Sequence, residues 1–316
     1  MTSTCFQYLG EIHDSIQHEI HMYIDQTFST QSTLSLGTLA DWIENKIEQT
    51  PGIDGLAFPV NLSKNEIVAH AVPSYKDKEV FNEKDILKID FGFHQNGYLI
   101  DAAFSYTQDP EKQEIIRIAE EATAAGIKMI RMDQRLVEIG EVIQEIIESG
   151  GYRSIWEVCG HSIDRYRIHA GQAVPNCRFP KEWHYEERVR SGFSYSVETF
   201  PTTGNGQTIT VDVPVGKRIY MRRWKMMEKT VKNWLEDTYK GLAFSYRTLY
   251  RDLHKEGKEE NWIHWMQYVT KHPEVYESFS PIVAIPEKKQ KTCIVAQVEN
   301  NVWIDPMSEV SYVLKK

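Results

Sequence analysis

The strongest structural constraint in this chain is residues 85 to 106, DILKIDFGFHQNGYLIDAAFSY, which predict a β-hairpin containing acidic residues. The Asn-Gly pair at 96 and 97 favours a two-residue turn, because both residues tolerate positive φ. With that turn, Asp90 and Asp101 lie on the same face of the hairpin as diagonal neighbours, about 7–8 Å apart. That separation would allow two carboxylates to share a metal cluster.

The two faces of this hairpin differ in chemistry. One face is almost entirely apolar and carries Leu87, Ile89, Phe91, Phe93, Tyr98, Ile100, Ala102 and Phe104. The two aspartates lie on the other face, and a carboxylate inside an apolar strand is costly unless something compensates its charge. A metal cation is the simplest compensator, whereas Lys88 is the nearest basic residue for a purely structural pair. The hairpin alone leaves both interpretations open.

Composition and charge narrow the class of protein. The 316 residues are 41% hydrophobic and 26% charged, which is ordinary for a globular protein with a substantial core. A formal net charge of −9 argues against a general nucleic-acid binder, whose affinity would depend on clustered Lys and Arg. We find no apolar run long enough to cross a bilayer and no signal peptide. The 4 cysteines lack CxxC spacing and fit a reducing compartment, so we expect a cytosolic protein.

Apolar spacing indicates helices in the first half of the chain. Four are predicted, over residues 5–25, 36–49, 110–131 and 136–149. Asp109 and Pro110 fit the N-cap and the first position of the third helix. Two glycines at 150 and 151 would end the fourth.

The second and fourth of these helices match at an offset of one hundred residues. Leu36 corresponds to Leu136, and Ile43 to Ile143. The match predicts an internal duplication within one domain of residues 1–316, with halves of about 5–107 and 108–316. Two related halves would enclose a site between their sheets, where ligands often bind.

The stretch from about 216 to 285 interrupts this pattern and predicts a helical insertion in the second half. It is rich in Lys, Arg, Trp and Tyr and contains MEKTVKNWLEDTYKGLAFSYRTLYRDLHK. Its start, KRIYMRRWK at 217 to 225, mixes basic residues with Tyr220 and Trp224, a combination that could contact ribosomal RNA. A solvated loop is the favoured interpretation.

Three further residues have the character of metal ligands. His161 lies in CGHSIDRYRIHAG, Glu198 in YSVETFPTTG and Glu299 in IVAQVENNVW. Each glutamate interrupts an apolar, strand-like run, as the two aspartates do. Four such carboxylates with one imidazole suit Mn, Fe(II), Co or Zn in a cluster of two ions. Taken alone, His161 would more often be a structural histidine.

The ordered motifs IDFG, IDAAF, GHSI, RIHAG, ETF and AQVE resemble those of the methionine aminopeptidases, specifically their type 2 branch. The resemblance runs from about residue 10 to the C-terminus and includes LAFP at 57 to 60 and GLAF at 241 to 244. Type 2 members carry a helical insertion of about this size, which the type 1 branch lacks. The resemblance implies an α/β (α+β) pita-bread fold, with two pseudosymmetric halves around a dinuclear metal site in a single catalytic domain.

The resemblance also implies a role for each matching residue. Asp101 and Glu299 would bridge two divalent ions. Asp90 would complete the coordination of one ion, and His161 with Glu198 that of the other. Bridging carboxylates would offset the repulsion between the ions, which together lower the pKa of a shared water.

The implied reaction is cotranslational removal of the initiator methionine from polypeptide N-termini whose second residue is small. His70 and His169 match the family's two non-ligand histidines, which contact substrate and stabilise the tetrahedral intermediate. Glu198 would accept and relay a proton from the attacking water. His169 would also limit the size of the second residue. The methionine pocket maps onto residues that are more often plain core: Phe58, Ile168, Phe200 and Ala243.

This chain departs from the family at three positions. It has Ile219 where the family usually has His, and Pro201 and Asn300 where relatives carry smaller or different residues. No expected ligand is lost, but substrate range and rate stay open. The chain also begins directly at the catalytic domain, without the long charged N-terminal extension of many eukaryotic relatives, so we expect no ribosome tethering through such an extension. We expect a monomer with at most transient ribosome contact.

Two alternatives remain. A prolidase or aminopeptidase P of the same fold would use similar metal ligands, but the insertion and the LAFP motif before His70 favour methionine removal. A non-catalytic pita-bread protein that binds RNA or protein partners would generally have lost ligands, whereas all five positions here hold chelating residues.

Overall fold

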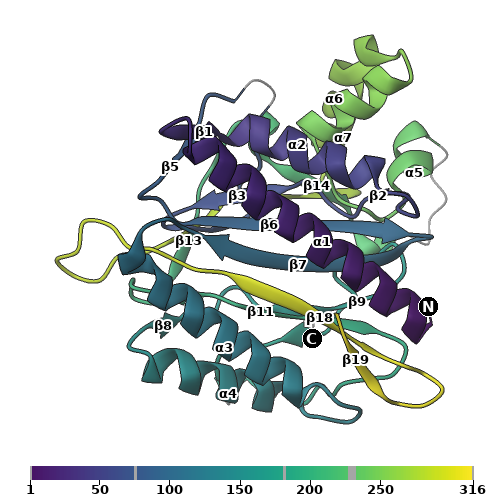
Figure 1. The fold of residues 1–316 in the computed structure, drawn as a ribbon. Helices are drawn as coiled ribbons and strands as arrows, with labels where there is room; N and C mark the ends of the chain where they lie inside the picture. The colour runs from purple at the N-terminus through teal and green to yellow at the C-terminus, as the bar shows by residue number, and fades with distance from the viewer. Residues whose placement is uncertain (1, 75–76, 181–182, 227–232, 315–316) are drawn as a thin grey trace.

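A nine-stranded antiparallel sheet runs through the part of the chain that the computed structural model describes, residues 2–74, 77–180, 183–226 and 233–314 (Figure 1). Its main path is β10 (Ala173–Val174), β9 (Gly160–Ile163), β11 (Ser194–Thr199), β18 (Val298–Ile304), β7 (Tyr98–Tyr106), β6 (Leu87–Gln95) and β2 (Gly55–Leu56). Off this path, β19 (Ser311–Val313) pairs with β18, and β3 (Asn61–Lys64) with β6. The sheet therefore joins segments from both halves of the chain.

The predicted hairpin forms β6 and β7 with the expected register. Asp90 pairs with Ala103 and Gly92 with Asp101. Asn96 has a φ of 53° and the glycine after it a φ of 80°, as a two-residue turn of this type requires. The prediction that both aspartates share one face is confirmed.

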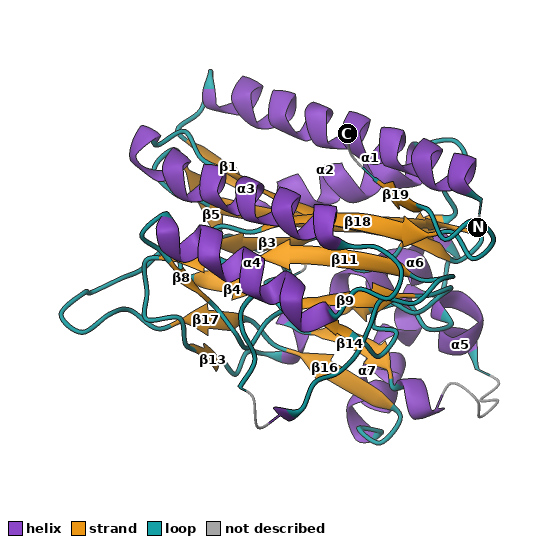
Figure 2. Cartoon of the chain, turned by 90° about the horizontal axis from the view of Figure 1, so that it is seen from below, coloured by secondary structure: helices purple, strands orange, loops and turns teal. Residues whose placement is uncertain are grey.

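Helices cover the apolar face of the sheet in two pairs (Figures 1 and 2). These helices are α1 (Ser3–Phe28), α2 (Leu36–Gln49), α3 (Gln113–Met129) and α4 (Leu136–Ser149). The first pair packs with the apolar side chains of β6 and β7, and the second pair with those of β11 and β18. Because the helices occupy this face, the acidic residues point to the other. The internal duplication itself stays a proposal.

The start of the third helix differs from the prediction. A 3-10 turn, η1 (Pro110–Lys112), precedes α3, and the Asp109 side chain accepts a hydrogen bond from the backbone N–H of Glu111. Asp109 therefore caps the 3-10 turn, and the α-helix itself begins three residues later than expected. Figure 2 shows α3 and α4 lying side by side.

The stretch expected to be a helical insertion contains both helices and strands. Its helices are α5 (Trp234–Tyr239), α6 (Tyr246–Lys255) and α7 (Trp262–Lys271). They pack with a sheet formed by β15 (Phe244–Ser245), β14 (Ile219–Arg222) and β16 (Tyr276–Phe279). Residues 227–232, where the predicted helical pattern begins, lie outside the described residues. The strands at both ends were not predicted, and they matter because β14 and β16 border the site.

Short strands form three further small sheets. They are β1 (Thr33–Ser35) with β5 (Val80–Asn82), β8 (Arg153–Ser154) with β12 (Pro201–Thr202), and β13 (Thr208–Thr210) with β17 (Ile282–Ala284) and β4 (Ile67–Ala69). Among the described helices, none combines the length and the apolar character that a membrane span needs.

Candidate metal centre

Four neighbouring strands bring the predicted acidic residues into one row. Asp90 on β6 pairs with Ala103 on β7, and Ala103 pairs with Glu299 on β18. Glu299 in turn pairs with Glu198 on β11. Since residues opposite one another in a sheet share a face, these three carboxylates point the same way. Asp101 lies two residues from Ala103 on β7 and therefore joins them.

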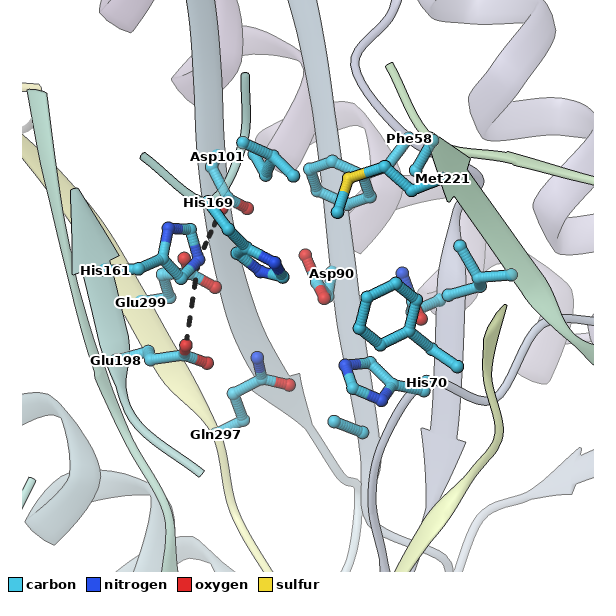
Figure 3. A pocket seen from close by; sticks show the side chains of 16 residues that line it. Phe58, His70, Asp90, Asp101, His161, His169, Glu198, Met221, Gln297 and Glu299 are labelled. Atoms are coloured by element: carbon cyan, nitrogen blue, oxygen red, sulfur yellow. Dashed lines mark ion pairs between the residues drawn. The ribbon is translucent and has the colours of Figure 1, made fainter. Parts of the chain in front are cut away.

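His161 on β9 adds an imidazole to this group. Its Nε2 lies 3.4 Å from Oδ2 of Asp101 and 4.0 Å from Oε1 of Glu198 (Figure 3). Asp101, His161 and Glu299 each offer a ligand atom, and these atoms lie within 4.8 Å of one another. Asp90 and Glu198 lie outside this tight set but line the same cleft. All five residues expected to bind metal thus converge on one place.

Buried negative charge dominates the electrostatics of this cluster. Burial raises the pKa of Asp90, Asp101 and Glu198 well above the usual range of a carboxyl group, and repulsion from Glu299 raises it further. Burial also raises the pKa of Glu299, to about 7. These groups are perturbed by one another rather than by a basic partner, so the cluster gains from a cation.

The structural alternative for the aspartates, a pair with Lys88, does not form. The Nζ of Lys88 donates to the backbone oxygens of Asn65, at 2.8 Å, and Val295, at 3.1 Å. Its side chain is fully buried, and burial lowers its pKa to about 7. Lys88 is thus held by backbone carbonyls instead.

The residues present fit a divalent cation. Oδ1 of Asp90 is buried without a hydrogen-bond partner among the described residues, a costly arrangement unless a ligand such as a cation binds it. The hydroxyl of Ser196 donates to Glu299, and the backbone N–H of Asp101 donates to Oδ1 of Asn301 at 2.8 Å. These bonds fix the β7 backbone at Asp101 and the carboxylate of Glu299, while the other carboxylate oxygens of the cluster face the cleft. Oxygen donors with one imidazole suit the divalent first-row metals.

The cleft has an apolar side opposite the acids. It has about 580 Å³ of empty space, part of it open to solvent, and is lined by Phe58, Asn61, Ala69, His70, Asp90, Asp101, His161, Ile168, His169, Glu198, Ile219, Met221, Ala243, Phe279, Gln297 and Glu299. In Figure 3, His161, Glu198 and Glu299 lie on one side, while Phe58, Met221 and His70 lie on the other. The site therefore has the acidic residues and His161 on one side and a largely apolar wall on the other.

The two histidines expected to contact substrate flank Phe279. Ring centroids are 5.4 Å apart between His70 and Phe279, and 5.9 Å apart between His169 and Phe279. Burial, with the nearby His169, lowers the pKa of His70 to about 4, so its ring is neutral at pH 7. The pKa of His169 is also lowered by desolvation in the cleft, although its side chain keeps contact with solvent. A neutral imidazole can donate one hydrogen bond without adding charge to the site.

The apolar wall agrees only in part with the expected methionine pocket. Phe58, Ile168 and Ala243 line the cleft together, but Phe200 does not. Phe200 is 1% exposed and packs in a different cluster, with Ile155 among others. It shares a face with Glu198, but it follows the end of β11 and borders a second cleft beside the first. Its expected place in the pocket is therefore corrected.

The insertion supplies two wall residues that sequence reasoning missed, Met221 and Phe279. Ile219 and Met221 lie on the same face of β14, and Ile219 pairs with Phe279 on β16. All three side chains line the cleft, so Ile219 places apolar surface where the family usually has a histidine. The alternating pattern of IYMR was the available sequence signal for a strand here, but the segment is only four residues long.

The basic segment at 217 to 225 is largely engaged in ion pairs. Four pairs join Lys217 to Asp77, Arg218 to Asp212, Arg222 to Glu236 and Arg223 to Glu277. These contacts hold the segment against its neighbours. They favour a structural role over contact with RNA.

Comparison with known proteins agrees with this geometry. The family model of metallopeptidase family M24 matches residues 5–224. Methionine aminopeptidase 2 of Komagataella phaffii is 32% identical over 298 residues, covering 86% of this chain and 62% of the relative. A methionine aminopeptidase of Thermococcus onnurineus is 34% identical over 243 residues, covering 76% of this chain and 78% of the relative. The chain thus spans less than two thirds of the yeast relative and most of the archaeal one.

Solved structures share the fold at low sequence identity. A methionine aminopeptidase from Rickettsia prowazekii superposes with a TM-score of 0.62 at 16% identity, covering 99% of this chain and 96% of that one. A thermophilic Arx1 superposes with a TM-score of 0.73 at 11% identity, covering 99% and 90%. The expected pita-bread architecture is confirmed by these neighbours.

Proposed function

This chain belongs to metallopeptidase family M24, and from that membership and its cleft we propose that it is a methionyl aminopeptidase. Its substrates would be polypeptides that begin with methionine and have a small second residue. One observation carries the proposal: a single cleft holds all five expected metal ligands beside a largely apolar wall. A non-catalytic protein would have no need of such a costly buried charge cluster.

We propose that the cleft holds two divalent ions, with Mn, Fe(II), Co and Zn as the candidates. Asp101 and Glu299 would lie between the ions, Asp90 would bind one of them, and His161 and Glu198 would bind the other. When bound, the ions would lower the pKa of a shared water and polarise the carbonyl that is attacked.

The chain's own residues would position the substrate and move the proton. Glu198 lies at the outer end of the acidic row, and we assign it the proton taken from the attacking water. His70 and His169 remain neutral, so each could donate an N–H to the oxygen that gains charge. Neither histidine belongs to the proposed ligand set.

The apolar wall would receive the methionine side chain. Phe58, Ile168, Met221, Ala243 and Phe279 line it, and their flexible or flat surfaces suit an unbranched thioether. On the opposite side, His169 packs against His161, with their ring centroids 4.5 Å apart. We propose that His169 limits the space for the second residue, so a small second residue would be preferred.

Metal analysis and peptide cleavage test the proposal together. The purified protein, stripped with a chelator and reloaded with Mn or Co, should bind two ions per chain and release Met from Met-Ala-Ser. Met-Arg-Ser should be cleaved far more slowly. Failure to bind metal and to release Met would reject the function. Efficient cleavage of X-Pro peptides would instead favour a prolidase of the same fold.

We further propose that the protein acts as a monomer in the cytosol, where polypeptide N-termini emerge during synthesis. The absence of CxxC spacing among its cysteines supports a reducing compartment. Sedimentation of the purified chain tests the monomer, because a dimer would double the measured mass.

A further inference from the structure

Tyr166 connects the turn of the metal-bearing hairpin to the helical insertion. Its backbone N–H donates to the oxygen of Gly97, at 2.8 Å. Its ring lies so close over Gly97 that a Cβ there would be 2.2 Å from the ring. Its hydroxyl accepts a hydrogen bond from Nζ of Lys240 at 3.0 Å, and that Nζ lies 4.2 Å from the ring centroid. One side chain thus holds two segments that are distant in the sequence.

Tyr166 and Lys240 each lie close in the sequence to a residue of the proposed methionine pocket. Ile168 follows Tyr166 by two residues, and Ala243 follows Lys240 by three. Ile168, Leu242 and Ala243 belong to the same apolar cluster, which Tyr166 also contacts. The distance between the two walls therefore depends on how Tyr166 and Lys240 are held together.

The backbone at Lys240 is in an unusual conformation. Its φ is 55° and its ψ is −104°, a combination that residues with a side chain rarely adopt. Its N–H donates to the oxygen of Glu236 at 3.0 Å, at the end of α5. Such a conformation persists only where surrounding contacts impose it, and the contact with Tyr166 is one of them.

Another pocket lies on the far side of Ala243. It has about 950 Å³ of empty space, part of it open to solvent, and is lined by Tyr239, Leu242, Ala243 and His94 together with charged residues such as Arg251 and Asp252. Ala243 borders both this cavity and the candidate site. Because this space is open to solvent and is not filled by core side chains, packing on that side does not fix the position of Ala243.

We propose that Tyr166 and Lys240 form a clamp that positions the pocket residue Ala243, with Leu242 beside it, and so sets how strictly the pocket selects methionine. The clamp rests on the proposed aminopeptidase function. Both are positioning residues, because neither lines the cleft. Opening the clamp lets Ala243 and the adjoining backbone shift toward the open pocket behind them, which widens the methionine pocket for branched first residues and weakens its contacts with methionine.

Three variants and a control test the clamp in the metal-loaded full chain. Lys240→Met removes the charge but keeps a side chain of similar length, and Tyr166→Phe removes only the hydroxyl. Lys240→Gly removes the whole side chain and also relieves the strain of the positive φ at this position. Lys271→Met is the matched control, since Lys271 is an exposed lysine at the end of α7. The readouts are kcat and KM for Met-Ala-Ser and Leu-Ala-Ser, and amide hydrogen exchange of residues 239–243 without substrate.

The clamp predicts a change in selectivity as well as in mobility. Lys240→Met should lower the ratio of kcat/KM for Met-Ala-Ser over Leu-Ala-Ser by about 2- to 5-fold, the scale of an exposed cation–π contact. The change should arise mainly in KM, with faster exchange at 239–243, and Tyr166→Phe should have a smaller effect in the same direction. Lys240→Gly should lower the ratio without loss of thermal stability.

Two outcomes would overturn the clamp. One is an unchanged ratio with unchanged exchange in all three variants. The other is an equal fall in kcat for both peptides, which a purely structural role would give. If the wild-type protein releases no Met, the proposed function fails on its own, and hydrogen exchange alone then decides whether the clamp holds the wall.

Discussion

A buried ion-pair network joins α2 to α6, and we expect Glu44→Gln to lower the free energy of unfolding by about 3 kcal/mol. Glu44 is completely buried and pairs with both Arg247 and Arg251. Removing one partner of a buried pair costs about 3–5 kcal/mol, because the remaining charge is left uncompensated. We expect the lower end of this range, because each arginine retains another ion pair. Arg247 still pairs with Asp41 at 2.6 Å, and Arg251 still pairs with Glu48 at 2.9 Å.

Urea denaturation of the metal-free protein measures this loss, with intrinsic tryptophan fluorescence as the signal. Glu48→Gln is the matched control, because Glu48 is 23% exposed and its pairs are nearer the surface. An exposed pair contributes about 0–1 kcal/mol. Equal effects of Glu44→Gln and Glu48→Gln, both below about 1 kcal/mol, would refute the argument that burial makes this network strong.

Glu44 also contacts the segment that leads to the cleft, so its variants test stability and the site together. Oε1 of Glu44 accepts a hydrogen bond from the backbone N–H of Val60 at 3.3 Å, and Val60 follows the cleft residue Phe58 by two positions. Glutamine keeps this acceptor, so Glu44→Gln should weaken folding more than it disturbs the cleft. We expect Glu44→Ala, which removes the acceptor as well, to raise KM for Met-Ala-Ser.

Three further predictions concern the cleft and the buried lysine beside it. Asp101→Asn should abolish metal binding and activity while circular dichroism stays that of the wild type, because an amide keeps the shape but not the charge. His70→Ala should lower kcat by about 10²-fold or more, the scale for losing one oxyanion donor, with metal content unchanged. The pKa of Lys88 is about 7 in the folded protein and about 10.4 in the unfolded chain. Between about pH 7 and pH 10, the unfolded chain therefore holds more of this lysine's proton than the folded protein does. The free energy of unfolding should therefore rise from pH 7 toward pH 9 in the wild type, and this rise should be smaller in Lys88→Met.

The sequence predicts the structure best where the determinants are local. The hairpin register follows from a two-residue turn and the period-two alternation of its strands, and both aspartates lie where that logic puts them. The helices at Leu36–Gln49 and Leu136–Ser149 match their predicted bounds, because apolar spacing and flanking turn residues act within a few residues. Pro110 shows the limit, since its position favours helix initiation without deciding between a 3-10 and an α-helical first turn.

The acidic row could not be predicted from local signals. Glu299 joins the aspartates only because β18 pairs with β7 across nearly two hundred residues, and Glu198 because β11 pairs with β18 across about one hundred. Neither pairing has a connecting turn that would set its register. Before the fold was known, only the resemblance to a family placed these glutamates beside Asp101.

The apolar wall explains why the pocket was predicted only in part. Its missed residues, Met221 and Phe279, come from strands of four residues inside a stretch whose pattern is otherwise helical. The misplaced residue, Phe200, lies on the correct face but past the end of its strand. Alternation predicts the face a side chain occupies, whereas its position along the cleft depends on where each strand stops. Selectivity for the first residue should therefore respond most to changes in the insertion, where strand ends and the Lys240 backbone determine the position of the wall.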